Sequence, residues 1–130
     1  MKRTTLIALS MLAGAALGGL AIEGLHAQAK PPVYAIIDID AITDSATDAK
    51  NTGRSNAEAS AVFANTGGKF LVRNGKVNSL DGTPPKRVIV AVFDSAEKLQ
   101  EWWNSPAQKK VTDIRMKSTK SRAFMVEGLQ

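Results

Sequence analysis

Two aspartates are the residues of this sequence best suited to chemistry. Asp38 and Asp40 lie in the segment VYAIIDIDAI, so an extended backbone directs both carboxylates to one face, about 7 Å apart. A carboxylate there can act as a general base or anchor a ligand, most effectively where burial raises its pKa. The alternative interpretation is structural, with Asp40 in water at the strand end and Asp38 paired with an arginine.

Arginines and aromatic residues complete the candidate set for ligand binding. Arg73, Arg87 and Arg122 flank predicted strands, where a guanidinium group can hold a carboxylate through two parallel hydrogen bonds. Such arginines more commonly pair with a carboxylate of the protein itself. Tyr34 in the first predicted strand and Trp103 in a predicted helix are the aromatic candidates for a pocket wall.

Residue types that are missing exclude several classes of mechanism. The sequence contains no cysteine, and its single histidine, His26, lies in a segment that we expect to be removed. Nucleophilic pairs of the Ser–His and Cys–His kinds are therefore excluded, and zinc held by His or Cys is disfavoured. Haem held by His or Cys is excluded as well, whereas ligation by Tyr or Met is not. We expect neither a metal site nor a cofactor, and the groups that remain for chemistry are carboxylates, Lys, Arg, Tyr34 and the tryptophans.

The beginning of the chain has the order of a secretory signal peptide. A basic start, Met1–Arg3, precedes the uncharged run Thr4–Ile22, and the small-x-small sequence Ala27–Ala29 follows. This order predicts cleavage after Ala29 and export, to the periplasm or outside the cell; the alternative is an uncleaved membrane anchor. Residues 30–130 would then form one exported domain, free of the membrane, whose hydrophobic core stabilises it without disulfides.

Apolar periodicity and turn signals indicate alternating strands and helices in that domain. Strands are predicted at 33–42, 69–73, 86–93 and 121–127, the third of them central because it is apolar on both faces. Helices are predicted from about 55 to 65, with a break at Gly53, and on either side of Asn104–Pro106, the last ending at 117. This β-α-β-β-α-β order is typical of a ferredoxin-like α+β fold, in which helices cover one face of a four-stranded antiparallel sheet.

The uncovered face of that sheet predicts a partner. Alternation directs Ile37 and Ile39 toward the helices. Tyr34, Ile36 and Asp38 then lie on the opposite, open face. An apolar open face in so small a chain indicates that a second molecule covers it, and a homodimer joined sheet to sheet is expected.

The helix that contains the two tryptophans has a predicted inner stripe. Ala96, Leu99 and Trp103 recur at helical spacing, so we expect Trp103 to point toward the sheet and Trp102 to lie at the flank. The same helix is expected to begin with Asp94 as its N-cap.

The last helix is predicted to present a narrow apolar stripe and a basic surface. The stripe consists of Ala107, Val111, Ile114 and Ser118. Arg115 is expected to bridge to an acidic residue. A basic patch with no interleaved aromatics favours a solvated surface over nucleic-acid binding. Its members are Lys109, Lys110, Arg115, Lys117, Lys120 and Arg122.

A set of ordered motifs resembles a known bacterial family. They are GGKFLVRNG (67–75), RVIVAVFDS (87–95), WWNSP (102–106), IR (114–115) and VEG (126–128). Together they are similar to domain-of-unknown-function family thirteen-thirty, within the dimeric α/β-barrel superfamily, over about residues 34–128. The resemblance implies a dimeric ferredoxin-like fold. Related families include cofactor-independent monooxygenases, muconolactone isomerase-like enzymes and haem-handling proteins, so it implies no single activity.

The sequence also departs from that family. Its first helix lacks the tyrosines that the family tends to carry, and Ala107–Gln108 stand where the family often has an acid and a tyrosine. The family's aspartate late in the first strand corresponds to Asp38 or Asp40.

Three functions are consistent with these observations. The first is an exported dimer that binds a small, mostly apolar ligand between sheet and helices, with Tyr34, Asp38, Arg73, Arg87 and Trp103 as candidate contacts. The second is a cofactor-independent isomerase or monooxygenase-like enzyme with Asp38 as its base. The third is a structural or stress-related dimer without a ligand.

Overall fold

The first strand has the most regular apolar pattern in the chain and lies inside the sheet. The computed structural model describes residues 30–52 and 56–130; in it β1 spans Val33–Ile42. Burial alternates along the strand, with Ile37 and Ile39 buried and Ile36 less so. The predicted division of the strand into two faces is therefore confirmed.

Three further strands complete an antiparallel sheet in the order β2-β3-β1-β4. They are β2 (Lys69–Val72), β3 (Arg87–Phe93) and β4 (Thr119–Glu127). The central position predicted for β3 is confirmed. The strand order and the helices on one face also confirm the ferredoxin-like fold class.

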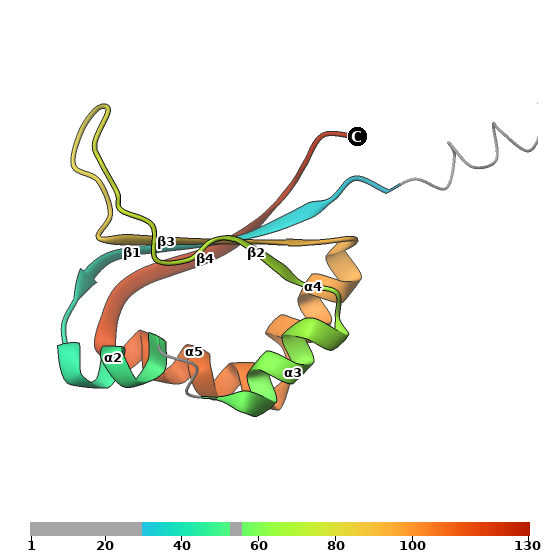
Figure 1. Cartoon of the computed structure of the whole chain (residues 1–130), viewed down its shortest axis with the longest axis horizontal. Helices are drawn as coiled ribbons and strands as arrows, with labels where there is room; N and C mark the ends of the chain where they lie inside the picture. The colour runs from blue at the N-terminus through green and yellow to red at the C-terminus, as the bar shows by residue number, and fades with distance from the viewer. Residues whose placement is uncertain (1–29, 53–55) are drawn as a thin grey trace, which may run out of the picture. The chain divides into compact units, whose positions relative to one another are not determined.

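The described helices all lie on one face of the sheet (Figure 1). They are α2 (Ser45–Thr52), α3 (Ala57–Asn65), α4 (Ala96–Trp103) and α5 (Pro106–Ser118). The first crossover thus contains two helices where the sequence predicted one, and the break predicted at Gly53 lies outside the described residues. Asn56 begins α3 as its N-cap, accepting a hydrogen bond from Ala59 N at 3.0 Å.

The two tryptophans are arranged in the opposite way to the prediction. Trp102 is 4% exposed and belongs to the core with Phe93 and Leu99, whereas Trp103 is only partly buried and packs against that core. The helix is rotated so that Leu99 lies at the centre of the buried stripe. Four apolar residues in eight allow either rotation. The aromatic partner on the sheet, Phe93, favours Trp102 because their rings stack with centroids 5.3 Å apart.

Two further helix predictions are corrected. The N-cap of α4 is Ser95 rather than Asp94: its side chain accepts from Lys98 N at 3.3 Å. The stripe of α5 is also displaced, because Ile114 is 38% exposed whereas Arg115 is buried. Arg115 therefore does not belong to the basic surface patch.

The chain leaves α3 and β2 through turns of different kinds. Gly67 has φ 78°, and the Gly67 and Gly68 amides donate to Ala64 O and Phe63 O, both at 3.0 Å. These bonds and the positive φ of Gly67 are those of a glycine C-cap at the end of α3. The whole segment 73–86 is a loop that projects away from the helices (Figure 1).

The compact unit defined by the fold begins at Pro31. The predicted signal peptide, residues 1–29, lies outside the described residues, so its cleavage stays a prediction. Within residues 30–52 and 56–130, none of the helices has the length and hydropathy needed to cross a membrane.

Candidate functional site

A cavity of about 250 Å³ lies between the helices and the inner face of the sheet. Its floor is formed by alternate residues of β1 and β3, among them Ile37, Ile39 and Ile89. Its roof is formed by α2, α3 and α5, and Trp102 of α4 closes one side. An apolar cavity of about 150 Å³ already accommodates a benzene ring, so this one has room for a ring with a polar substituent.

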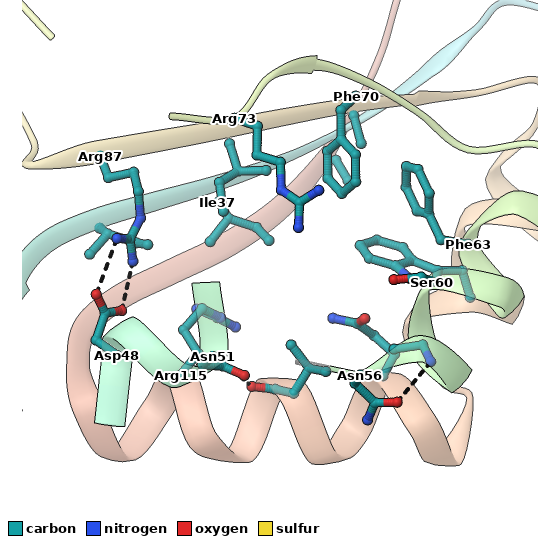
Figure 2. Close-up of a pocket in the computed structure, with 18 residues that line it drawn as sticks. Ile37, Asp48, Asn51, Asn56, Ser60, Phe63, Phe70, Arg73, Arg87 and Arg115 are labelled. Atoms are coloured by element: carbon teal, nitrogen blue, oxygen red, sulfur yellow. Dashed lines mark hydrogen bonds and ion pairs between the residues drawn. The ribbon is translucent and has the colours of Figure 1, made fainter. Parts of the chain in front are cut away.

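The inner face of β3 changes from charged to aromatic along its length, so the two ends of the cavity differ in chemistry. Arg87 begins the strand on this face and Phe93 ends it, with Ala91 and Ile89 between them. We call the region of Asp48, Arg87 and Arg115 the charged end. We call the region of Phe63, Phe70, Phe93 and Trp102 the aromatic end; Figure 2 shows Phe63 and Phe70 on the far side of the cavity from Arg87.

At the charged end, Arg87 pairs with Asp48 of α2. Two hydrogen bonds join them, from Nη2 to Oδ1 at 2.7 Å and from Nη1 to Oδ2 at 3.2 Å (Figure 2). Both side chains are largely buried, at 15% and 8% exposure. Arg87 Nε is buried and has no hydrogen-bond partner among the described residues. This bidentate pair fixes α2 to the start of β3.

Arg115 of α5 enters the same end from the opposite wall. It is only 7% exposed, and its Nη1 donates to Ser121 Oγ at 2.6 Å. Within the described residues no carboxylate lies within ion-pair distance of it. Burial lowers the pKa of the Arg115 guanidinium, because desolvation penalises its charged form. The acidic partner expected for this residue is therefore absent from the described part of the chain.

Arg73 reaches the cavity from the end of β2. Figure 2 shows its side chain extending from the sheet toward the helix layer, next to Phe70. Its guanidinium carbon lies 4.5 Å from the centroid of the Phe70 ring, a cation–π contact. The register shift of β2 between Phe70 and Val72 accompanies this arrangement, since a bulge redirects the following side chains.

The aromatic end is assembled from four elements. Phe63 of α3 stacks on Phe70 with ring centroids 4.3 Å apart, and meets Phe93 and Trp102 edge to face, each at 5.5 Å. Gly68 permits this position of Phe63, because a Cβ atom at residue 68 would lie 2.5 Å from Phe63 Cε2. The wall is therefore apolar and closely packed.

The structure divides the residues that the sequence singled out. Arg73 and Arg87 line the cavity, as a ligand site requires. Tyr34 and Asp38 lie on the open face of the sheet, away from the cavity. Trp103 lines a separate hollow of about 400 Å³ between α4 and the inner face of β4, whose described lining has no charged side chain.

Asp38 adopts the structural alternative considered from the sequence. Its Oδ2 accepts hydrogen bonds from Nη2 and Nε of Arg122, at 2.8 and 3.2 Å, in the neighbouring strand. This contact raises the pKa of Arg122. Asp38 Oδ1 is buried without a partner among the described residues. Nothing in this arrangement brings Asp38 near the cavity.

Sequence reasoning missed the residues that complete the cavity. Asp48 lies in a polar helix with no apolar stripe. Only its pairing with Arg87, 39 positions away in the sequence, shows that it belongs to the site. Phe63, Phe70 and Trp102 were assigned to elements but not to a site. Within the described residues, no three His, Cys, Asp or Glu side chains are grouped as metal ligands.

Solved structures share this fold. A protein of unknown function from Rhodopseudomonas palustris is 17% identical, with a TM-score of 0.61, over 85% of this chain and 92% of its own. SnoaB, a cofactor-independent oxygenase from Streptomyces nogalater, is 15% identical with a TM-score of 0.51, over 77% of this chain and 95% of its own. A dimeric protein of unknown function and ferredoxin-like fold from Bacteroides fragilis is 16% identical with a TM-score of 0.50, over 75% of this chain and 96% of its own. At such identities the likeness shows the fold alone.

Sequence comparison identifies the family. No curated protein sequence matches the chain. The model of a family described as "Domain of unknown function (DUF1330)" matches residues 32–129, a span that contains the sheet, the described helices and the cavity. The chain therefore belongs to the DUF1330 family, as its motifs predicted.

Proposed function

We propose that this protein binds a small, mostly apolar molecule in the cavity between its sheet and helices. The observation that carries the proposal is the cavity itself, which has apolar walls and a few converging polar side chains, the usual composition of a small-molecule site. A filled interface between sheet and helices would have excluded it.

The alternative function, an enzyme with Asp38 as its general base, is not supported by the position of Asp38. Asp38 lies on the opposite face of the sheet, bonded to Arg122, and the cavity's carboxylate, Asp48, is bonded twice to Arg87. SnoaB shows that this fold can host an oxygenase, but a shared fold does not transfer an activity. Binding is the function that the described side chains support.

We further propose that the protein is a homodimer joined through the open sheet face. Cross-strand rows on this face are apolar: Ile36 lies opposite Val90 on one side and Phe124 on the other. Phe124 is 49% exposed in the single chain, and burying such a row against its own copy is energetically favourable. The structurally similar Bacteroides fragilis protein is a dimer. We also propose that this chain is exported before it forms the dimer.

A cavity-filling substitution tests the binding proposal. Ala59 of α3 is buried and lines the cavity, so Ala59→Leu should fill part of it. Binding of toluene, followed by chemical-shift changes in NMR, is expected for the wild type and lost in this variant. Ala61→Leu, at an exposed position on the same helix, is the matched control and should bind as the wild type does. No toluene-dependent shifts at cavity residues of the wild type would contradict the proposal.

The dimer is tested separately by sedimentation. Phe124→Glu places a charge in the open apolar face and is expected to yield monomers. Met116→Glu, at a 58% exposed position on α5, should leave the mass unchanged. A wild-type monomer at micromolar concentration would refute this part.

A further inference from the structure

We propose that the cavity selects an organic acid, a small compound with a flat apolar body and one carboxylate held by Arg115 and Arg73. This inference rests on the proposed binding function and specifies the class of ligand. It begins from the charges that line the cavity: three guanidinium groups, on Arg73, Arg87 and Arg115, face one carboxylate, on Asp48.

Arg87 shows how this protein accommodates an arginine with a purely structural role. Its charge is matched by Asp48 through two hydrogen bonds, one of them 2.7 Å long. Bidentate geometry and burial of both partners leave little of that charge for a ligand. The pair therefore serves as an internal reference for the other two arginines.

Arg115 has no such counter-ion. It is as deeply buried as Asp48, at 7% against 6% exposure. Its described contacts are one hydrogen bond to the neutral Ser121 hydroxyl and the face of Trp103, whose ring centroid is 5.8 Å from its guanidinium carbon. A buried cation without an anion is unfavourable. An anionic ligand in the cavity would supply the missing charge.

Arg73 provides a second cation without the cost of deep burial. Within the described residues it forms no ion pair, and its guanidinium is held over the Phe70 ring at 4.5 Å. The planar fork of a guanidinium group matches a carboxylate, so two arginines from opposite walls can hold one carboxylate between them. Figure 2 shows Arg73 directed from the sheet toward the helices that carry Arg115.

The aromatic end defines the rest of the ligand. Phe63, Phe70 and Trp102 present an apolar wall of aromatic rings, and an aromatic ligand can stack on such rings or meet them edge to face. At about 250 Å³ the cavity holds a single ring with a short acidic substituent. A larger phosphorylated nucleoside does not fit that volume, and a neutral hydrocarbon leaves Arg115 unmatched.

The experiment compares benzoate with benzamide, which has nearly the same shape and no charge. Calorimetric titration of the full chain at neutral pH is expected to show benzoate binding at least tenfold more tightly. Arg115→Gln, which keeps a hydrogen-bond donor toward Ser121, should reduce benzoate affinity about tenfold and leave benzamide affinity unchanged. Arg73→Gln, at an exposed position, should act in the same direction and serves as the test if the Arg115 variant does not fold.

Arg122→Gln is the matched control, because this arginine lies on the open face and should leave the binding of both probes unchanged. Equal affinities for the two probes would overturn the organic-acid inference while the binding function stood. Equal losses of benzoate affinity in the Arg115 and Arg122 variants would also overturn it. Absence of binding by benzoate, benzamide and toluene would remove the proposed function itself, and the inference with it.

Discussion

The two ends of the inner sheet face differ in how they are stabilised, although one strand runs through both. At the aromatic end, Phe93 and Trp102 are almost completely buried and stack on each other. At the charged end, Arg115 is buried and the Arg87 side chain is largely buried, and among the described residues only Arg87 of these two has a carboxylate partner. Close packing of aromatic rings stabilises the first end, whereas the second retains polar groups and an unmatched charge. A region of that kind is better suited to binding a ligand than to stabilising the fold.

The largest expected effect concerns the aromatic end. Trp102→Ala removes a buried indole and should lower the free energy of unfolding by about 3–5 kcal/mol. Trp103→Ala should cost clearly less, because this ring packs at the edge of the core. Urea denaturation of both variants measures the difference. Equal losses would mean that Trp102 is not the core residue and that the contrast between the two ends is overstated.

The next effect concerns the charged end. Asp48→Asn leaves the Arg87 guanidinium buried without its counter-ion, so we expect a loss of about 3 kcal/mol. In the monomeric Phe124→Glu background, Asp38→Asn removes the carboxylate charge of the Asp38–Arg122 pair on the open face, where the Arg122 side chain is 68% exposed in the single chain, and should cost much less. Thermal unfolding of the two variants compares them directly. If the loss is the same for both, burial does not determine the value of these pairs.

Loss of the N-cap of α4 is expected to have a smaller effect on stability. Ser95→Ala removes the side chain that caps α4 and should destabilise the protein by about 1 kcal/mol at any pH between 5 and 8. Ser95→Asp is the matched variant, since aspartate is an equally good cap and should retain stability. A stability loss that varied with pH in the alanine variant would contradict a role limited to the neutral hydroxyl.

The smallest effect is the one that should depend on pH. Asp44 precedes α2, and its carboxylate accepts hydrogen bonds from the Thr47 hydroxyl at 2.7 Å and the Thr47 amide at 3.1 Å. These bonds lower the pKa of Asp44 in the folded protein. The stabilisation that the Asp44 carboxylate provides is therefore complete above its pKa in the unfolded chain, near 3.8. This stabilisation is lost as the pH falls through the lower pKa of the folded protein. The stability difference between wild type and Asp44→Ala should shrink accordingly in acid, and a difference that grew there would reverse the assignment.

Local patterns predicted the elements well because their signals are local. The ten residues Val33–Ile42 alternate so regularly that both strand limits and both faces follow from the sequence. The rotation of α4 did not follow, because Leu99 is compatible with either tryptophan as its buried neighbour. The decisive contact, between Trp102 and Phe93, joins different elements.

The candidate site was predictable only in part, for the same reason. Arg73 and Arg87 could be selected because they flank strands, but the two have different roles. Arg87 is neutralised by Asp48, from a helix whose composition gave no sign of burial. Arg115 was assigned to a basic surface because lysines surround it in sequence, and only the packing of α5 turns it inward. Charge inside a cavity is a property of tertiary contacts.

The hydrogen atom that serves as the side chain of Gly68 has a consequence for comparing relatives of this protein. Residue 68 does not line the cavity, yet any larger side chain there would displace the Phe63 ring from its place between Phe70 and Trp102. Two family members with identical lining residues could therefore differ in cavity shape through this position alone. A classification of ligand preference across the family should include such supporting positions together with the residues that touch the ligand.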